Sequence, residues 1–310
     1  MTGAEGSGWS GNGEAAPTRV GRRATPKAAL GSLGPSLAAQ YVWARRSIIA
    51  LVGDVLSEHR RALTLVGGQA VILRTIDRHG VNLSTEDADF ALTPSLVASD
   101  PRIEDALTQA GFVPRSDSRP GLWGRSPYTS PTGRTAFAER IDLDVPAALS
   151  GNESPRRRSV AATLRHGRGA ATVARGLELA VYDRSLMTVS DLEDPALSVE
   201  VYVAGVPALI MAKAFKIGER LFDSGRYFRD KDAADLFALM GSAAPAAVAE
   251  TFSEYSDDPA IGVSVQAGIA YLVRLLADAG FIRTMREAVS PPVPPAHLGP
   301  LVQSWREAFS

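Results

Sequence analysis

The chain contains no cysteine among its 310 residues, which excludes disulfide bonds, thiolate metal ligands and cysteine nucleophiles. It has no apolar run of the roughly 18–20 residues that span a bilayer, and its N-terminus lacks the apolar core of a signal peptide. The net charge is only −1, so the chain as a whole lacks the basic excess typical of nucleic-acid-binding proteins. These absences favour a cytoplasmic protein with no membrane partner.

The composition that remains is that of a globular protein, with 45% hydrophobic residues and a length that fits two modest domains. Residues 1–34 are rich in Gly, Ser, Ala, Thr and Pro and are expected to form a disordered tail. Residues 35–204 alternate between strand and helix patterns, whereas residues 205–310 are mainly helical in pattern. The sequence therefore predicts an α/β (α+β) fold, in which a small mixed sheet is followed by a helical C-terminal domain.

The most informative stretch lies between residues 63 and 93. The apolar run Leu63–Val66 predicts a short buried strand, Gly67–Gly68 predicts a turn, and residues 70–79 repeat apolar side chains at helical spacing. The chain then returns in an alternating strand that contains Asp87 and Asp89. Because side chains two residues apart on a strand point to the same face, the two carboxylates are expected to lie side by side near the glycine turn.

This order of elements favours phosphate chemistry. Hard divalent cations such as Mg²⁺ or Mn²⁺ are held by carboxylates together with substrate phosphates. A Gly-Gly turn that opens a helix offers backbone N–H groups and the positive end of the helix dipole, which suit a triphosphate. An Asp-x-Asp pair alone is common, but its combination with the preceding strand, turn and helix is much more specific.

On these residues the sequence resembles the DNA polymerase β-like nucleotidyltransferase superfamily, whose signature is a Gly-Gly or Gly-Ser turn followed by an Asp-x-Asp strand. The segments VGGQAVILR and TEDADFAL are most similar to the AbiEii and MenT-type nucleotidyltransferases, the toxins of bacterial toxin–antitoxin and phage-defence systems. The resemblance extends from about Leu63 to Met240. It implies a metal-dependent nucleotidyltransferase that takes an NTP as its substrate, with Gly67 and Gly68 contacting the nucleotide and Asp87 and Asp89 binding the metal.

The same resemblance implies a third carboxylate on a neighbouring strand. Residues 138–146 alternate so that Arg140, Asp142 and Asp144 share one face. Asp142 matches the family pattern, and Asp144 is the second candidate. In polymerase-type chemistry the third carboxylate helps to hold the catalytic metal and accepts the proton of the attacking hydroxyl.

Two further blocks complete the implied site. Lys213 matches a lysine on the helix after Pro207 that reaches the nucleotide phosphates in the family, and this role is favoured over the alternative of an ordinary solvated lysine. Residues 231–236 match a Lys-Asp-x-x-Asp-Leu block. Within this block Asp232 and Asp235 lie three residues apart on one helix face. Asp232 is assigned to the catalytic site, and Lys231 and Asp235 to nucleotide binding.

The acceptor is the least determined part of the reaction. By resemblance it is the 3′ end of tRNA, whose modification would block translation, and a cognate antitoxin is then an expected partner. A basic run in residues 151–176, interpreted as an exposed loop, could bind tRNA phosphates or be only a solvated surface. The run consists of Arg156, Arg157, Arg158, Arg165, His166, Arg168 and Arg175. An antibiotic or a protein as the acceptor, or a non-catalytic nucleotide-binding module, are the alternatives.

Overall fold

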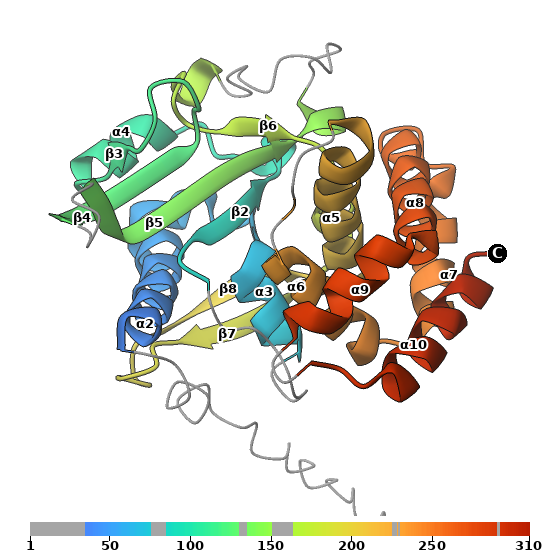
Figure 1. The fold of residues 1–310 in the computed structure, drawn as a ribbon. Helices are drawn as coiled ribbons and strands as arrows, with labels where there is room; N and C mark the ends of the chain where they lie inside the picture. The colour runs from blue at the N-terminus through green and yellow to red at the C-terminus, as the bar shows by residue number, and fades with distance from the viewer. Residues whose placement is uncertain are drawn as a thin grey trace, which may run out of the picture.

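The computed structural model describes residues 35–75, 85–129, 135–150, 164–224, 228, 230–289 and 292–310. In this part of the chain a mixed β-sheet is followed by a series of helices that gather at one end of the sheet (Figure 1). The predicted α/β class is therefore confirmed. The expected N-terminal tail and the expected end of the helix near His79 lie outside the described residues.

The sheet is assembled from eight strands. In chain order they are β1 (Leu63–Val66), β2 (Ala88–Leu92), β3 (Val113–Pro114), β4 (Leu122–Thr129), β5 (Thr135–Pro146), β6 (Thr172–Ala174), β7 (Arg184–Ser190) and β8 (Ser198–Ala204). Across the sheet their order is β3-β4-β5-β2-β1-β8-β7, and β6 pairs with β5. β2 is antiparallel to β1 but parallel to β5, so the centre of the sheet is mixed as expected.

The side chains of β5 alternate between a buried apolar face and a polar face, as the sequence predicts. Ile141, Leu143 and Val145 are fully buried, whereas Asp142 and Asp144 are partly exposed on the other face. The strand that carries Asp89 begins one residue later than expected, at Ala88, and Asp87 therefore stands just before it.

The helices have these bounds: α2 (Pro35–Ala50), α3 (Gly67–Thr75), α4 (Ile103–Gln109), α5 (Val206–Gly218), α6 (Asp230–Ser242), α7 (Pro245–Ser256), α8 (Gly262–Ala277), α9 (Ala279–Ala288) and α10 (Pro295–Ala308). α2 continues into a π-helical turn at Leu51–Val55 and packs against β5, β7 and β2. α5 has Pro207 in its first turn, where the missing N–H has no helical partner to lose. It packs against α8, α6 and α3, which brings the C-terminal helices to the glycine turn.

One continuous cluster of buried apolar side chains joins the sheet to the C-terminal helices. The predicted boundary between residues 204 and 205 does fall between β8 and α5. The core nevertheless runs across it, from Phe90 in the sheet through Phe215 in α5 to Trp305 in α10. The site at the sheet therefore depends on the packing of helices that come much later in the chain.

Two predictions about the middle of the chain are wrong. The run of residues 177–182, LELAVY, predicts a strand from its apolar side chains, but Glu178–Val181 is a 3₁₀ helix. The Glu178 carboxylate is buried and accepts a hydrogen bond of 2.7 Å from the backbone N–H of Gly176, which fixes a turn there. Residues 151–176 were expected to be a loop, but Thr172–Ala174 pairs with β5 as strand β6.

No helix in the described ranges is by itself long and apolar enough to cross a membrane. Two consecutive pairs meet the length and composition test only when joined, α6 with α7 across a bend of 101° and α8 with α9 across a bend of 83°.

Trp305 is expected to carry much of the docking of the last helix. Its side chain is fully buried, its ring stacks on Phe309, and its indole N–H donates to the Met240 carbonyl over 3.3 Å. Trp305→Ala should therefore lower the free energy of unfolding by about 3–5 kcal/mol, measured by urea denaturation. Val263→Ala, at an 85% exposed position in α8, should change it by less than about 0.5 kcal/mol. Equal effects of the two changes would contradict this packing.

Candidate functional site

The Gly67–Gly68 turn connects the end of β1 to the start of α3. Gly67 has a φ of +64°, a left-handed conformation that side chains disfavour. A Cβ atom there would also collide with the carboxylate of Asp89. A Cβ atom on Gly68 would lie 2.7 Å from the Thr85 hydroxyl and 2.8 Å from the Lys231 amine. The two glycines thus let an acid and a base lie directly against the backbone at the beginning of the helix.

The carboxylates come together through strand register. Asp89 on β2 is paired with Asp142 on β5, and Asp144 is paired with Ala91 two residues further along. Asp142 is therefore the direct neighbour of Asp89, while Asp144 lies one step away on the same face. This register supports Asp142 rather than Asp144 as the third carboxylate. Asp87, just before β2, is within reach of the same arginine as Asp142.

Burial and, after it, the neighbouring carboxylates raise the pKa values of Asp89, Asp142 and Asp144. Burial raises the pKa of Asp89, and the neighbouring charge of Asp87 raises it further. Burial also raises the pKa of Asp142 well above its ordinary value, with further contributions from Asp89 and Asp87. The pKa of Asp144 is raised to about 7, first by burial and then by Asp89. Neighbouring carboxylates raise one another's pKa because their negative charges repel, and a bound cation lowers those pKa values again.

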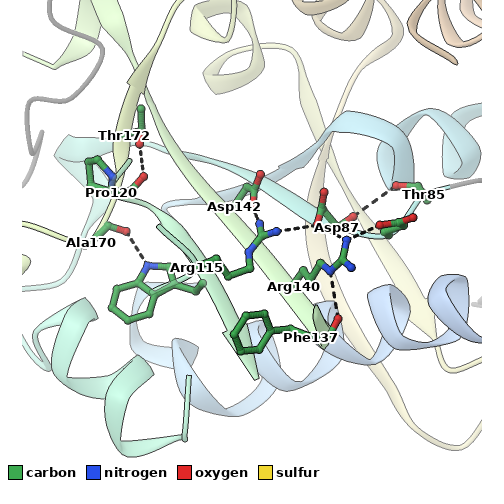
Figure 2. Close-up of polar contacts among 11 residues, drawn as sticks. Thr85, Asp87, Arg115, Pro120, Phe137, Arg140, Asp142, Ala170 and Thr172 are labelled. Atoms are coloured by element: carbon green, nitrogen blue, oxygen red, sulfur yellow. Dashed lines mark hydrogen bonds and ion pairs between the residues drawn. The ribbon is translucent and has the colours of Figure 1, made fainter. Parts of the chain in front are cut away.

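Two arginines contact this acidic group from the sheet side (Figure 2). Arg115 donates one hydrogen bond to Asp142 and another, of 3.4 Å, to Asp87. Arg140 donates to Glu86 and lies 4.0 Å from Asp87. The sequence did not single out Arg115, because it follows a two-residue strand in a loop-rich segment where no periodic pattern predicts its direction.

A second group of charges lies on α5 and α6. Lys213 is only 7% exposed, and its ammonium donates to Asp235 over 2.6 Å and to Asp232 over 3.0 Å. Burial opposes the charge on Lys213, but Asp235 and Asp232 outweigh it and raise the pKa of the lysine. Lys216, which is 46% exposed, also donates to Asp232 over 2.9 Å. The structure thus places Lys213 inside a buried ion-pair network.

Lys231 connects the two groups. It is the second residue of α6, and its amine lies next to Gly68. Burial lowers its pKa, while the neighbouring charges of Asp235 and Asp89 oppose that shift. The structure therefore brings the predicted residues together in two neighbouring groups, the acids on the sheet and the charges on α5 and α6, with Lys231 at the glycine turn and Lys213 between Asp232 and Asp235. Of the two lysines, Lys231 is the better placed to meet a phosphate at the turn.

The donors on the sheet suit a hard divalent cation in kind, because Asp87, Asp89 and Asp142 offer only carboxylate oxygen. Burial and then the neighbouring carboxylates raise the pKa values of Asp89 and Asp142. Within the described ranges, no group of three His, Cys, Asp or Glu side chains is spaced to hold a metal ion as it stands. The guanidinium of Arg115 separates Asp87 from Asp142. The chemistry of the residues therefore fits a cation, and the carboxylates would have to close around it.

The basic run differs from its expected form. Arg156, Arg157 and Arg158 lie outside the described residues. Arg165 and Arg168 are exposed, whereas His166 is buried against His59, with ring centroids 5.5 Å apart. Arg175 pairs with Glu219 over 3.2 Å. As far as the structure describes it, the run thus offers fewer free basic side chains than the sequence suggested.

Comparison of the chain with protein-family models, with curated proteins and with solved structures gives no match.

The close contact at Gly67 is expected to be intolerant of a side chain. Gly67→Ala would force alanine into a left-handed conformation and displace the Asp89 carboxylate, so it should lower the free energy of unfolding by about 1–3 kcal/mol. Gly241→Ala in α6 is the control, because a Cβ atom there meets nothing within 4 Å. It should be neutral or slightly stabilising. Urea denaturation of the two variants tests this, and an unchanged Gly67→Ala protein would contradict the turn.

Asp232 is expected to stabilise the fold through its ion pairs. Asp232→Asn removes a carboxylate that is 2% exposed and leaves Lys213 buried with one acid, so it should cost about 3–5 kcal/mol at pH 7. Asp105→Asn, in an exposed pair with Arg102, should cost less than about 1 kcal/mol.

The loss in Asp232→Asn should depend on pH. Burial disfavours the Asp232 charge, but Lys213 and Lys216 outweigh burial and lower its pKa below the ordinary 3.8. The stabilisation is therefore fully present above pH 3.8 and disappears as the pH falls through the lowered pKa of the folded state. The difference in stability between wild type and Asp232→Asn should shrink below pH 4. A loss under 1 kcal/mol at pH 7, or one that grows in acid, would rule out this role.

Proposed function

We propose that this chain is a metal-dependent nucleotidyltransferase of the DNA polymerase β-like superfamily, of the AbiEii and MenT type. It would transfer a nucleoside monophosphate from an NTP to an acceptor. The observation that carries the proposal is the pairing of Asp89 with Asp142 in register, with the Asp89 carboxylate lying against Gly67. A carboxylate pair and a glycine turn at a helix N-terminus are what a metal–triphosphate complex requires.

The carboxylates on the sheet would bind the cation. Asp87, Asp89 and Asp142 are the ligands proposed for Mg²⁺ or Mn²⁺. When bound, the cation neutralises charge on the transferring phosphoryl group and orients it. Asp142, whose pKa is raised well above its ordinary value by burial and by Asp89, also suits the proton-accepting role expected of the third carboxylate.

The glycine turn and Lys231 would hold the triphosphate. The backbone N–H groups of the first turn of α3, which begins at Gly67 and Gly68 and lacks helical acceptors for them, would donate to phosphate oxygens. The Lys231 amine beside Gly68 would add a positive charge. Lys213, Asp232 and Asp235 would keep α5 and α6 in place behind Lys231, because their ion pairs join the two helices.

In the proposed reaction a hydroxyl oxygen of the acceptor attacks the α-phosphorus of the NTP. The new P–O bond forms as the bond to pyrophosphate breaks, and the hydroxyl proton passes to one of the carboxylates on the sheet. No covalent intermediate with the protein is needed, since positioning and electrostatic stabilisation can carry phosphoryl-type transfer. We propose the 3′ end of tRNA as the acceptor and a toxin role in the cytoplasm, with a cognate antitoxin as a partner. Exposed Arg165 and Arg168 offer contacts to RNA phosphates.

A transfer assay tests this proposal. Purified protein is incubated with Mg²⁺, total tRNA and each radiolabelled NTP in turn. Wild type should label tRNA with at least one NTP. Asp89→Asn keeps the shape beside Gly67 but removes the charge, so it should lower the transfer rate by about 10²–10³-fold. Asp105→Asn, an exposed acid on α4, should retain the wild-type rate.

Each other outcome has a definite meaning. Label on a protein or on a small molecule instead of RNA would keep the transferase and replace the tRNA acceptor. Equal labelling by wild type and Asp89→Asn would remove Asp89 from the reaction. Absence of label on any acceptor, together with absence of NTP binding, would favour the non-catalytic module.

A further inference from the structure

Arg115 reaches the acidic group from the far edge of the sheet. It directly follows β3, and its backbone N–H donates to the Leu122 carbonyl over 2.8 Å. Leu122 lies on β4 and is the register partner of Asp142 on β5. The β3–β4 hairpin therefore fixes the position of the Arg115 backbone, and β4 lies between Arg115 and Asp142. From that position the side chain can cross β4 and end between the carboxylates.

The guanidinium bridges two acids from different segments. One of its terminal nitrogens donates to Asp142 and the other lies 3.4 Å from Asp87, and the side chain is only 17% exposed (Figure 2). Arg140, the other arginine of the group, bonds mainly to Glu86. Within the described residues, Arg115 thus joins Asp87 to Asp142, two of the carboxylates that we assign to metal binding.

A guanidinium that bridges two carboxylates and a divalent cation that both carboxylates ligate require different spacings of the two acids. Mg²⁺ requires oxygen ligands at about 2.0–2.1 Å in a near-octahedral arrangement, whereas the planar guanidinium fork holds carboxylates apart through its separate nitrogens. Binding of the ion therefore requires the carboxylates to release Arg115 and to converge. The free energy of those hydrogen bonds opposes metal binding.

We propose that Arg115 competes with the divalent cation for Asp87 and Asp142 and so sets the metal affinity of the site. This inference rests on the proposed function, because it assumes that those carboxylates bind the metal. Arg115 is a positioning residue in this scheme. Before the cation arrives it compensates the crowded negative charge and keeps the carboxylates in place, and it yields them when the cation binds.

Manganese binding tests the competition without any turnover. Free Mn²⁺ is measured by electron paramagnetic resonance while it is titrated into each purified full-length protein in the absence of NTP. Arg115→Gln should bind Mn²⁺ about tenfold more tightly than wild type, because a competing cation and two hydrogen bonds are removed. Arg115→Lys keeps the charge but replaces the planar fork with a single point charge, which cannot hold Asp87 and Asp142 in the same fixed geometry, so it should bind about threefold more tightly.

Arg119→Gln is the matched control. Arg119 is an exposed arginine in the same connection between β3 and β4, and its charge acts on Asp144. Its loss changes the net charge equally without touching the bridge, so Mn²⁺ affinity should rise less than twofold. An equal gain in Arg119→Gln and Arg115→Gln would mean that general electrostatics, not competition, is responsible, and would overturn the proposal.

The remaining outcomes also decide the matter. Unchanged or weaker Mn²⁺ binding in both Arg115 variants would overturn the competition. If Arg115→Gln does not fold, as judged by circular dichroism, Arg115→Lys alone carries the comparison. Absence of Mn²⁺ binding in wild type and variants would also overturn it. The transfer assay judges the proposed function separately, because a protein can transfer nucleotides without this competition, or bind metal competitively without transferring them.

Discussion

The arrangement of charges around the site depends on one constraint, the crowding of carboxylates on one face of the sheet. Asp89 and Asp142 are adjacent through register, and Asp87 and Asp144 flank them. Such a group is unfavourable in a folded chain unless positive charge is close. The chain supplies that charge from both sides, with arginines reaching from the sheet and lysines from α5 and α6. The fold thereby holds negative charge at a glycine turn without neutralising it completely.

The two cation types suit their positions. Arg115 has a planar fork that can bridge separate carboxylates, which an ammonium group cannot do with fixed geometry. Lys213 is a compact charge enclosed by Asp232 and Asp235 on one helix, and it fastens α5 to α6. Lys213, which the family resemblance predicts to reach the nucleotide phosphates, lies within this ion-pair network in the described fold, and its phosphate contact stays a prediction. Lys231, at the start of the same helix, is left to face the turn.

Much of this arrangement follows from sequence patterns, and some of it could not. Strand alternation predicts which side chains share a face with Asp89 and with Asp142, and the Gly67–Gly68 pair predicts a turn with a close contact. Both predictions depend only on local sequence. Which strands become neighbours is a non-local property, so the pairing of Asp89 with Asp142 came only from the family resemblance. The contact of Arg115 with the acids could not be predicted from sequence, because the direction of its side chain is set by the β3–β4 hairpin. Glu178 misled the strand prediction because its buried carboxylate stabilises a turn that hydrophobic pattern cannot reveal.

The site also links distant parts of the chain in a way that makes its assembly cooperative. The turn belongs to residues 67–68, the carboxylates to β2 and β5, and Lys231 to α6, whose position depends on packing against α3, α5 and α9. The ring of Phe228, just before α6, contacts Phe281 in α9. Because the apolar core is continuous from the sheet to α10, a loss of helix packing at the C-terminus would move Lys231 away from Gly68. The helical region therefore contributes Lys231 to the candidate site.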